Sequence, residues 1–572
     1  MDGPLIVQSD KTLLLEVAHA DAPAARAAIA PFAELERSPE HVHTYRITPL
    51  ALWNARAAGY DAEQVVDALV RWSRFPVPQA LLVDVVDVMS RYGRLVLQSH
   101  PAHGLILAGH DPAVMAEILR NKKITPILGE RIDDDTVAVH PSERGRLKQA
   151  LLKVGWPAED EAGYVDGQAH TIELRTDGWQ LREYQTAAAD GFWQGGSGVV
   201  VLPCGAGKTL VGVAAMVRAQ ATTLILVTNT VAGHQWRREL LARTSLTEDE
   251  IGEYSGDRKE IRPVTIATYQ VLIRRQGGEY RHLSLLDAHD WGLIVYDEVH
   301  LLPAPVFRMT ADLQSRRRLG LTATLVREDG RETDVFSLIG PKRFDAPWKD
   351  IESQGWIAPA DCTEVRVTMT QAERMTYAVA EPEEQYRVAS TARSKIAVAR
   401  EIVRRHAGEP TLVIGAYLDQ LEEIGAALNA PVVQGSTRNA ERERLFDAFR
   451  AGEVPVLVVS KIANFAIDLP EASVAVQLSG TFGSRQEEAQ RLGRLTRPKH
   501  DGRQAHFYTV VSRDTVDTDY AAHRQRFLAE QGYGYRIVDA DDLLGPALPD
   551  ADAEAADDPA VADPDSPAGA EG

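Results

Sequence analysis

Short, almost continuous apolar runs alternate with amphipathic segments over most of the chain after residue 175. The first set of runs comprises Gly198–Pro203, Leu224–Thr228, Val264–Thr268, Gly292–Tyr296 and Arg318–Leu321. The second set comprises Thr411–Gly415, Pro431–Gln434, Val454–Ser460, Val474–Leu478 and His506–Val511. Strands buried on both faces have this pattern, and their alternation with helical segments is typical of βαβ units. The pattern therefore predicts two α/β domains in tandem, each built on a parallel sheet.

The chain before residue 170 has a different pattern, which predicts amphipathic helices and short strands. Asp61 is the predicted N-cap of a helix that ends at Trp72, and a second helix is predicted over Pro112–Arg120. No spacing typical of a catalytic motif occurs here. His41 and His43 lack further ligands nearby in the sequence, so we interpret them as surface or capping residues rather than a metal site.

These changes of pattern divide the chain into four parts. We predict a mixed α/β accessory domain over residues 1–170 and the first parallel-sheet domain over 171–345. Residues 346–545 are expected to hold a linker, with room for an insertion, and the second parallel-sheet domain. The stretch 331–400 is predicted to be less regular, because prolines interrupt it. Residues 546–572 are rich in Pro, Ala and Asp and lack aromatic residues, which predicts a disordered acidic tail.

The 572-residue chain has a formal net charge of -20, which taken alone argues against a nucleic-acid partner. Residues 537–572, however, contain eleven of the acidic residues and no Lys or Arg, so the rest of the chain carries only -9. Two cysteines, Cys204 and Cys362, are too few for a disulfide framework, which fits a reducing compartment. The sequence has no apolar run long enough to span a membrane and begins without signal-peptide features, so we expect a cytoplasmic protein with no membrane partner.

The strongest local signal is the sequence PCGAGKT, which begins at Pro203 between a predicted strand and a predicted helix. Its glycines permit a tight loop whose N–H groups can bind phosphates, Lys208 supplies a positive charge, and Thr209 supplies a hydroxyl ligand for Mg²⁺. The strict P-loop pattern has glycine six residues before the lysine, where this chain has Leu202. The shorter Gly-x-Gly-Lys-Thr form is the one used by helicase-like ATPases.

Two further motifs complete a nucleotide site. Asp297 and Glu298 follow a buried apolar run, so both carboxylates are expected at the end of a strand, one to hold Mg²⁺ and one to polarise the attacking water. Arg491, Arg494 and Arg497 recur every three residues in the second α/β domain, which places them on one face. Arginines inserted at a γ-phosphate from a neighbouring domain raise the rate about 10³- to 10⁵-fold. The motifs therefore predict an ATP site divided between two domains.

In their order along the chain, these motifs resemble those of superfamily 2 DNA helicases, and specifically the XPB group in its bacterial form. The resemblance covers about residues 175–540 and includes the Asp-Glu-Val-His box that starts at Asp297. It also includes the Arg-Glu-Asp triplet that starts at Arg327, which is associated with strand separation in that group. The resemblance implies two RecA-like domains, ATP and Mg²⁺ as cofactors, and single-stranded or forked duplex DNA as partner.

The resemblance also implies roles for individual residues. The implied nucleotide-binding residues are Arg182, Gln185, Gly205, Ala206, Gly207, Lys208, Thr209, Asp468 and Gln490. The implied catalytic residues are Lys208, Asp297, Glu298, Arg494 and Arg497, with Thr209 and Asp297 as the Mg²⁺ ligands. The residues implied to contact DNA or to couple it to ATP are Thr228, Thr268, Thr322, Thr324, Arg327, Glu328, Asp329, Gly435 and Ser460. Within these sets, Gln185 is expected to read the adenine, Arg494 and Arg497 are expected to be arginine fingers, and Trp236 belongs to a DNA-backbone motif.

We therefore expect an ATP-dependent 3′–5′ DNA helicase acting in DNA repair. A double-stranded DNA translocase that does not unwind by itself has the same ATPase motifs and is the alternative. A DNA-binding scaffold with a degenerate ATPase is disfavoured because the full motif set is present. An RNA helicase is disfavoured because the Asp-Glu-Val-His box together with the Arg-Glu-Asp triplet resembles the DNA-acting group. The sequence names no repair nuclease or transcription partner, and it has no carboxylate cluster of the kind that would give the chain nuclease activity of its own.

Overall fold

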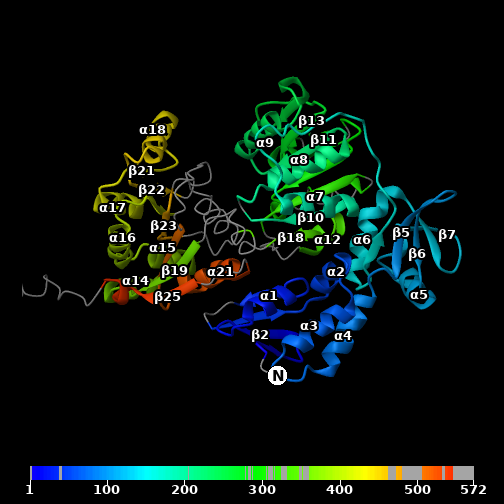
Figure 1. Cartoon of the computed structure of the whole chain (residues 1–572), viewed down its shortest axis with the longest axis horizontal. Helices are drawn as coiled ribbons and strands as arrows, with labels where there is room; N and C mark the ends of the chain where they lie inside the picture. Colours follow the sequence, from blue (N-terminus) through cyan, green and yellow to red (C-terminus); the bar gives the residue numbers. More distant parts are fainter. Residues whose placement is uncertain are drawn as a thin grey trace, which may run out of the picture.

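The computed structural model describes most of the chain. The described residues are 3–37, 41–203, 205–276, 279–280, 282, 285–286, 288–303, 306, 313–314, 316–323, 332–346, 351, 360–460, 472–479, 505–530 and 535–544. Three bodies are visible in Figure 1: the N-terminal region in blue and cyan, a first lobe in green, and a second lobe in yellow to orange. Within the described residues, no helix combines the length and the apolar character that crossing a bilayer requires. The acidic tail predicted over 546–572 lies outside the described residues.

The N-terminal region contains two sheets. The first is antiparallel, with the order β1-β2-β4-β3, and consists of β1 (Leu5–Val7), β2 (Thr12–Glu16), β3 (Glu34–Arg37) and β4 (Val42–Arg46). The second has the order β7-β8-β6-β5-β9 and consists of β5 (Leu95–His100), β6 (Gly104–Gly109), β7 (Leu128–Arg131), β8 (Thr136–Val139) and β9 (Ala158–Asp160). Their helices are α1 (Ala22–Ile29), α2 (Pro49–Ala57), α3 (Ala62–Trp72), α4 (Gln79–Ser90), α5 (Pro112–Arg120) and α6 (Arg144–Lys153).

Local sequence signals in this region are confirmed. The Asp61 side chain accepts from the Gln64 N–H at 2.8 Å, and the Gln64 side chain accepts from the Asp61 N–H, which together form a capping box at the start of α3. The interpretation of His43 as a surface or capping residue is wrong. Its side chain is buried in the core of the first sheet, where burial and the nearby Arg26 charge lower its pKa to about 4.

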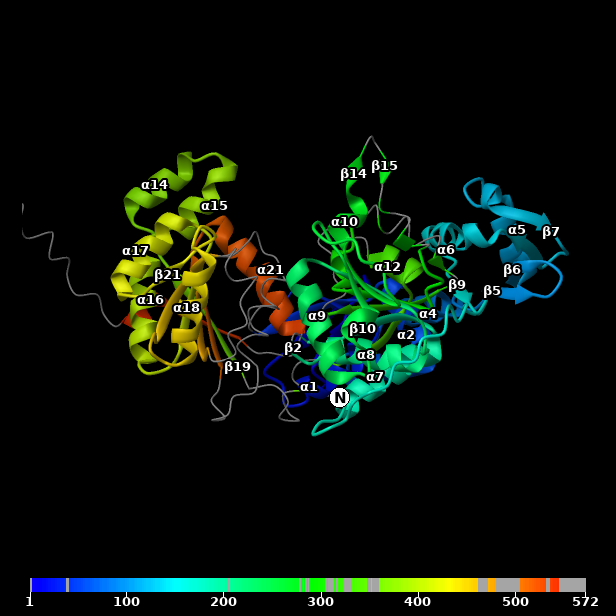
Figure 2. The same ribbon diagram turned by 90° about the horizontal axis from the view of Figure 1, so that it is seen from above.

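The first lobe is a seven-stranded parallel sheet with helices around it. Its order is β12-β13-β11-β16-β17-β10-β18. The strands are β10 (Ser197–Val201), β11 (Thr223–Val227), β12 (Ile251–Tyr254), β13 (Val264–Thr268), β16 (Leu293–Asp297), β17 (Arg317–Thr322) and β18 (Lys342–Asp345). The helices are α7 (Glu183–Gly195), α8 (Lys208–Ala219), α9 (Thr230–Arg243), α10 (Tyr269–Ile273) and α12 (Glu332–Leu338). A two-stranded hairpin, β14 (Arg275–Gln276) with β15 (Glu279–Tyr280), projects from this lobe in Figure 2.

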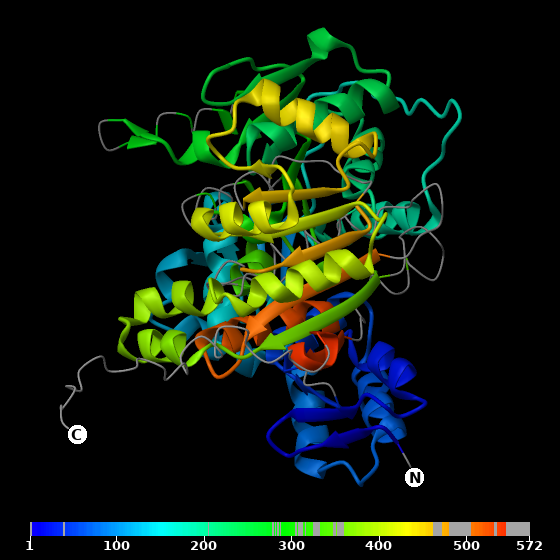
Figure 3. The same cartoon turned by 90° about the vertical axis from the view of Figure 1, so that its left-hand side faces the viewer.

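The second lobe repeats this architecture with the order β21-β22-β20-β23-β24-β19-β25, again parallel throughout. Its strands are β19 (Ala360–Val367), β20 (Thr411–Gly415), β21 (Val432–Val433), β22 (Val456–Ser460), β23 (Val474–Gln477), β24 (Ala505–Ser512) and β25 (Tyr535–Asp539). Its helices are α14 (Gln371–Val379), α15 (Pro382–Ser390), α16 (Ser394–Arg405), α17 (Leu418–Leu428), α18 (Asn439–Arg450), α21 (Val516–Glu530) and α22 (Ala540–Leu544). Figure 3 turns this lobe toward the viewer. The prediction of two tandem parallel-sheet α/β domains is confirmed.

One expectation about the region between the lobes is wrong. Residues 331–400 were expected to be less regular, but from Ala360 onward they form β19 and the helices α14, α15 and α16 of the second lobe. Proline does not interrupt these elements, because Pro382 is the first residue of α15, where the missing N–H costs no hydrogen bond. β19 pairs with β24 and β25, so it lies inside the sheet.

A buried polar network joins the N-terminal region to the first lobe. Lys148 of α6 donates to the Asp160 carboxylate and to the Gln314 side-chain carbonyl, both at 2.9 Å. Gln314 in turn donates to the Leu338 carbonyl at the end of α12. Burial is the main cause that lowers the pKa of Lys148, to about 8. The N-terminal region also contacts the second lobe, because α21 packs against β3. The accessory region therefore contacts both lobes.

Candidate nucleotide and nucleic-acid site

The predicted phosphate-binding segment lies between the strand β10 and the helix α8, the position that the sequence predicts. Gly207 is the N-cap of α8 with a φ of +80°, a left-handed conformation that favours glycine. A Cβ atom at Gly207 would lie 2.3 Å from Nε2 of Gln185, so a side chain here would displace the Gln185 amide. Lys208 and Thr209 occupy the first turn of α8, where unpaired N–H groups favour an anion. Cys204 lies outside the described residues.

Gln185 and Tyr184 fasten the start of α7 to this loop. The Gln185 amide donates to the Ala206 carbonyl at 2.9 Å and accepts from the Arg182 N–H at 3.0 Å. The Tyr184 hydroxyl donates to the same Ala206 carbonyl at 2.8 Å and accepts from the Arg182 guanidinium at 3.0 Å. In this structure the buried Gln185 amide therefore supports the phosphate loop, and its contact with adenine stays a prediction.

Asp297 and Glu298 stand at the carboxyl end of β16 and face the lysine of the loop. Lys208 Nζ lies 3.4 Å from Oε1 of Glu298. Glu298 has a φ of +51° and a ψ of +55°, the left-handed region that a residue with a side chain seldom occupies. Such backbone strain persists where the surrounding structure holds it, and it concentrates at functional sites. The lysine, the two carboxylates and the loop thus converge at one edge of the sheet.

The two carboxylates have opposite electrostatic environments. Burial and the negative charge of Glu298 raise the pKa of Asp297 to about 6. Burial acts in the same direction on Glu298, but the charges of Lys208 and His300 outweigh it, so the pKa of Glu298 lies below its usual value. Glu298 is therefore held ionised, whereas the ionised form of Asp297 is disfavoured, mainly by burial. A divalent cation bound to Asp297 would favour its ionised form.

His300 connects these carboxylates to the end of the neighbouring strand β17. Its Nδ1 lies 2.6 Å from the Thr322 hydroxyl and 3.5 Å from Oε2 of Glu298. Thr322 is a predicted coupling residue, and the hydrogen bond gives it a physical route to the acid pair. The other predicted residues of this segment, Thr324, Arg327, Glu328 and Asp329, lie outside the described residues.

Two aromatic side chains from the predicted DNA-facing elements also converge on Asp297. Trp236 of α9 donates from Nε1 to Oδ2 of Asp297 at 3.0 Å, and the Tyr269 hydroxyl donates to the Asp297 carbonyl at 2.8 Å. The sequence grouped Trp236 with a DNA-backbone motif, but its side chain is 1% exposed and faces the acid pair instead. Sequence reasoning missed this role of both aromatics. The available signal was that Tyr269 directly follows Thr268 and that Trp236 belongs to the same predicted motif as Thr228.

The predicted DNA contacts of the first lobe share one edge with the acid pair. Thr228 follows β11, Thr268 ends β13, and these strands pair in the register Val227 to Thr268. Because β11 also pairs with β16, this edge continues directly to Asp297. Thr268 is also the N-cap residue of α10. These threonines are therefore placed where a bound strand could act on the nucleotide site through α9 and α10.

The second lobe contributes two described candidates. Ser460 ends β22 and pairs in register with Gly415 at the end of β20, so it lies at the carboxyl edge of that sheet. Gly435 follows β21, and its carbonyl accepts from the Arg442 guanidinium at 3.3 Å. The remaining predicted residues of this lobe lie outside the described residues: Asp468, Gln490, Arg491, Arg494 and Arg497. The arginine contribution to the site therefore stays a prediction.

The fold and this site define a P-loop motor with two parallel-sheet lobes. Three family profiles match the chain: "Type III restriction enzyme, res subunit" over residues 178–327, "ERCC3/RAD25/XPB C-terminal helicase" over 351–547, and "Helicase conserved C-terminal domain" over 5–133. The last of these falls on the N-terminal region, where neither large parallel sheet lies.

Relatives match over nearly the whole chain. A Mycobacterium tuberculosis protein named DNA 3'-5' helicase XPB is 77% identical over 547 residues, which are 96% of this chain and 100% of that protein. A Kineococcus radiotolerans protein of the same name is 73% identical over 96% of this chain and 99% of its own length. The Antonospora locustae subunit XPB of general transcription and DNA repair factor IIH is 34% identical over 94% of this chain and 82% of its own length. The chain belongs to the XPB family of helicases.

Proposed function

We propose that the chain is an ATP-dependent DNA helicase that moves 3′ to 5′ and acts in DNA repair. The observation that carries the proposal is the convergence of Lys208, Asp297 and Glu298 at the carboxyl edge of the first sheet, beside the glycine loop. The 77% identical relative carries the name DNA 3'-5' helicase XPB, which supports the direction and the substrate. The same set of residues argues against a scaffold with a degenerate ATPase. DNA is the partner that we propose, and the cytoplasm is the compartment.

The residues present fit Mg²⁺-ATP. Asp297 at the end of β16 and Thr209 in the first turn of α8 supply a carboxylate and a hydroxyl, and such oxygen atoms are the donors that Mg²⁺ prefers. Asp297 and Thr209 would hold the ion, and the ion would neutralise charge on the phosphate oxygens. The N–H groups of the loop from Gly205 and of the first turn of α8 would hold the phosphates.

The chain's own side chains then divide the chemical work. Lys208 neutralises charge on the phosphates, and Glu298, which is held ionised, orients and polarises the attacking water. Arg494 and Arg497 would complete the site from the second lobe and stabilise the transferring phosphoryl group. Because the site is complete only when the lobes meet, hydrolysis would alternate between a closed and an open arrangement.

Coupling to DNA would use the described contacts around Asp297 and Glu298. Thr228 and Thr268 would contact the phosphates of one strand, and α9 with Trp236 would relay their position to Asp297. The hydrogen bond between His300 and Thr322 would couple changes at Asp297 and Glu298 to the segment that follows β17. Gly435 and Ser460 would hold the same strand from the second lobe. The Arg327-Glu328-Asp329 triplet would act at the point of strand separation.

ATPase measurements with and without single-stranded DNA test this proposal. Lys208→Ala and Glu298→Gln should abolish DNA-stimulated hydrolysis, because they remove the phosphate charge and the water-polarising carboxylate. Lys153→Ala at the exposed end of α6 and Glu383→Gln on the exposed face of α15 are matched controls that should keep wild-type turnover. Retained turnover in both site variants would refute the assignment of the ATPase site. Wild-type ATP hydrolysis at the same rate with and without DNA would refute DNA as the partner.

A second candidate function is translocation along double-stranded DNA without unwinding. It is favoured by the name of the Antonospora locustae relative, which is described as a helicase/translocase subunit. The ATPase chemistry is the same in both cases, so ATP turnover does not separate them. Displacement of a bound protein from duplex DNA, without release of a strand from a fork, would favour the translocase.

A further inference from the structure

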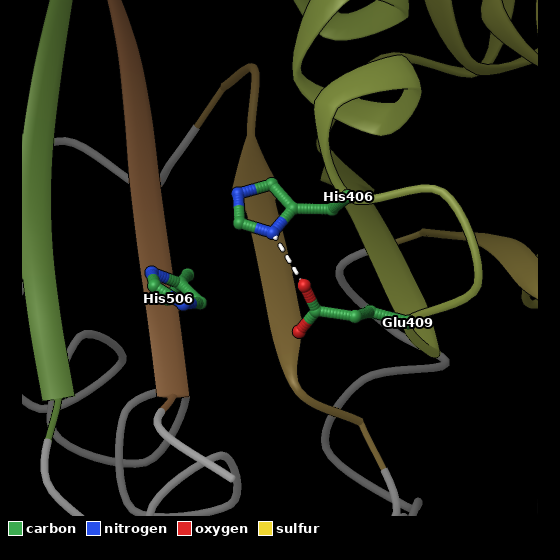
Figure 4. Close-up of side chains that lie close together, drawn as sticks. All are labelled: His406, Glu409 and His506. Carbon is green, nitrogen blue, oxygen red and sulfur yellow. Dashed lines mark hydrogen bonds and ion pairs between the residues drawn. The ribbon is translucent and has the colours of Figure 1, made fainter.

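Two histidines and a glutamate, His406, Glu409 and His506, lie close together in the second lobe (Figure 4). His406 is the C-cap residue that follows α16, Glu409 lies in the connection to β20, and His506 is the second residue of β24. Parallel strands all begin at the same edge, so this trio lies at the amino edge of the sheet. Ser460 and Gly415 lie at the opposite, carboxyl edge. The trio and the predicted DNA-coupling residue Ser460 therefore lie at opposite edges of this sheet.

The three side chains are close enough to share one ion. One ligand atom from each residue lies within 4.8 Å of the other two, and all three residues are half-buried. His406 Nδ1 lies 2.9 Å from Oε1 of Glu409, and the ring centroids of His406 and His506 are 4.7 Å apart. Within the described part of the chain, this is the group of His, Cys, Asp or Glu residues that has the spacing of a metal site.

Tyr508 gives the His406 ring a second contact. Its hydroxyl lies 2.9 Å from Nε2 of His406, two residues along β24 from His506. Histidines that bind metal through one nitrogen use the other to hydrogen-bond a partner, which fixes the tautomer and the ring orientation. With Nε2 held by Tyr508, the nitrogen left for a metal is Nδ1, which is the atom that faces Glu409.

We propose that His406, Glu409 and His506 bind a divalent transition-metal ion of the zinc class. Some zinc sites consist of two histidines and one glutamate with a water as the fourth ligand, whereas Mg²⁺ takes oxygen ligands. The ion replaces the proton that His406 Nδ1 and Glu409 share, and that proton leaves to solvent. The nitrogen and oxygen are already 2.9 Å apart, so only a small separation is needed to admit the ion.

Bound metal would fasten three elements of the lobe together. The ion would join the end of α16 and the connection to β20 with β24, across the intervening strand β23. A ligand that binds only the folded state raises its stability in proportion to occupancy. The expected consequence is a second lobe that resists unfolding better with metal, and a motor whose ATPase needs no metal at this site.

Cobalt titration of the full chain tests the proposal. Tag-free protein is stripped with EDTA and titrated with Co²⁺ without nucleotide, so that the ATP site and its metal do not contribute. We expect one Co²⁺ per chain with the visible absorption of a four-coordinate ion, and loss of that absorption when Zn²⁺ is added. Absence of this absorption in the wild-type chain would overturn the proposal.

Single substitutions identify the metal ligands, and a control substitution distinguishes loss of a ligand from a general effect on the fold. Glu409→Gln preserves the size of the side chain and should weaken Co²⁺ binding at least about 10-fold, His506→Ala should weaken it more, and Tyr508→Phe should weaken it about 10-fold. His103→Ala is the matched control, because His103 pairs with His100 in an exposed position at a ring distance of 4.9 Å. Unchanged Co²⁺ affinity in Glu409→Gln and His506→Ala, or loss of binding in His103→Ala, would overturn the assignment.

Discussion

Trp236 Nε1 donates a 3.0 Å hydrogen bond to Oδ2 of Asp297, and this bond joins a predicted DNA-facing helix to a predicted Mg²⁺ ligand. The indole is almost fully buried, and a Cβ atom added at Gly212 of α8 would lie 2.4 Å from its ring. The ring is therefore held between α8, which carries Lys208, and the end of β16. Any displacement of α9 by DNA would be transmitted to the Asp297 carboxylate.

Replacement of Trp236 by Phe should shift the acid limb of ATP hydrolysis to higher pH. The hydrogen bond stabilises the ionised form of Asp297, whose pKa is about 6, so its loss raises that pKa further. A hydrogen bond to a charged group contributes about 1.5 kcal/mol, which corresponds to about one pH unit. The measurement is kcat/KM for ATP against pH. Trp291→Phe is the control, because that buried indole donates to the Leu285 carbonyl instead, and a similar shift in this control would contradict the account.

Asp297→Asn should stabilise the protein above pH 6 while it abolishes hydrolysis. The pKa of Asp297 is about 6 in the folded chain and 3.8 for an ordinary Asp, so the unfolded chain loses this proton more readily. Asp297 therefore does not lower the free energy of unfolding below pH 4. Above pH 6, where its carboxyl is ionised, it lowers that free energy by an amount on the order of 2 to 3 kcal/mol.

Thermal unfolding at pH 4 and pH 7 measures this cost. We expect a higher Tm for Asp297→Asn at pH 7 and no difference at pH 4. Asp190→Asn is the control, since Asp190 is half-exposed and pairs with Arg218 at the surface, where an ion pair contributes little. A lower Tm for Asp297→Asn at pH 7 would show that the ionised carboxylate stabilises the fold instead.

How much of the molecule the sequence predicts depends on how each strand is buried. The strands Val264–Thr268 and Thr411–Gly415 match their apolar runs to the residue, because both faces of a central parallel strand are covered. The edge strand β18 has the sequence KRFD, and β19 alternates Glu364 and Arg366 with valines, so neither forms an apolar run. Their place in the sheet is set by pairing with distant strands, which a local pattern does not encode.

The same distinction applies to the site. Lys208, Asp297 and Glu298 carry their chemistry in short motifs that follow a strand, so local sequence identifies them. The Trp236 contact joins residues 61 positions apart and exists because β16 lies next to β11 in the sheet. The bond between His300 and Thr322 likewise depends on β17 lying next to β16. Strand order creates both contacts, and strand order is not visible in one sequence.

The Lys148 and Gln314 side chains should show strong coupling in a double-mutant cycle. Lys148→Met leaves a buried carboxylate with less compensation, and loss of one partner of a buried polar network costs about 3 kcal/mol. Gln314→Leu alone removes one of the two acceptors of Lys148 and leaves the Asp160 carboxylate. Because the two side chains are in contact, the double variant should cost less than the sum of the single variants. Denaturant unfolding of all four proteins measures this, and additive costs would indicate that the network does not join the N-terminal region to the first lobe.

Removal of residues 546–572 should leave ATP turnover intact and strengthen DNA binding at low salt. The segment carries acidic residues and no basic ones, so its charge repels DNA phosphates over a distance that salt screens. Fluorescence anisotropy with labelled single-stranded DNA measures the affinity at two salt concentrations. The difference from the full chain should disappear at high salt, and a variant with neutral amides in place of the tail carboxylates should behave like the deletion. Weaker binding or lost turnover after deletion would assign the tail an active role.

Strand release from forked DNA by the isolated chain with ATP is the decisive measurement for the helicase proposal. We expect ATP-dependent release from a 3′-tailed fork and none from a 5′-tailed one. Replacement of Arg327, Glu328 and Asp329 should stop release while DNA-stimulated hydrolysis continues. ATP hydrolysis that responds to DNA without release of a strand from either fork would contradict the helicase proposal and favour a translocase.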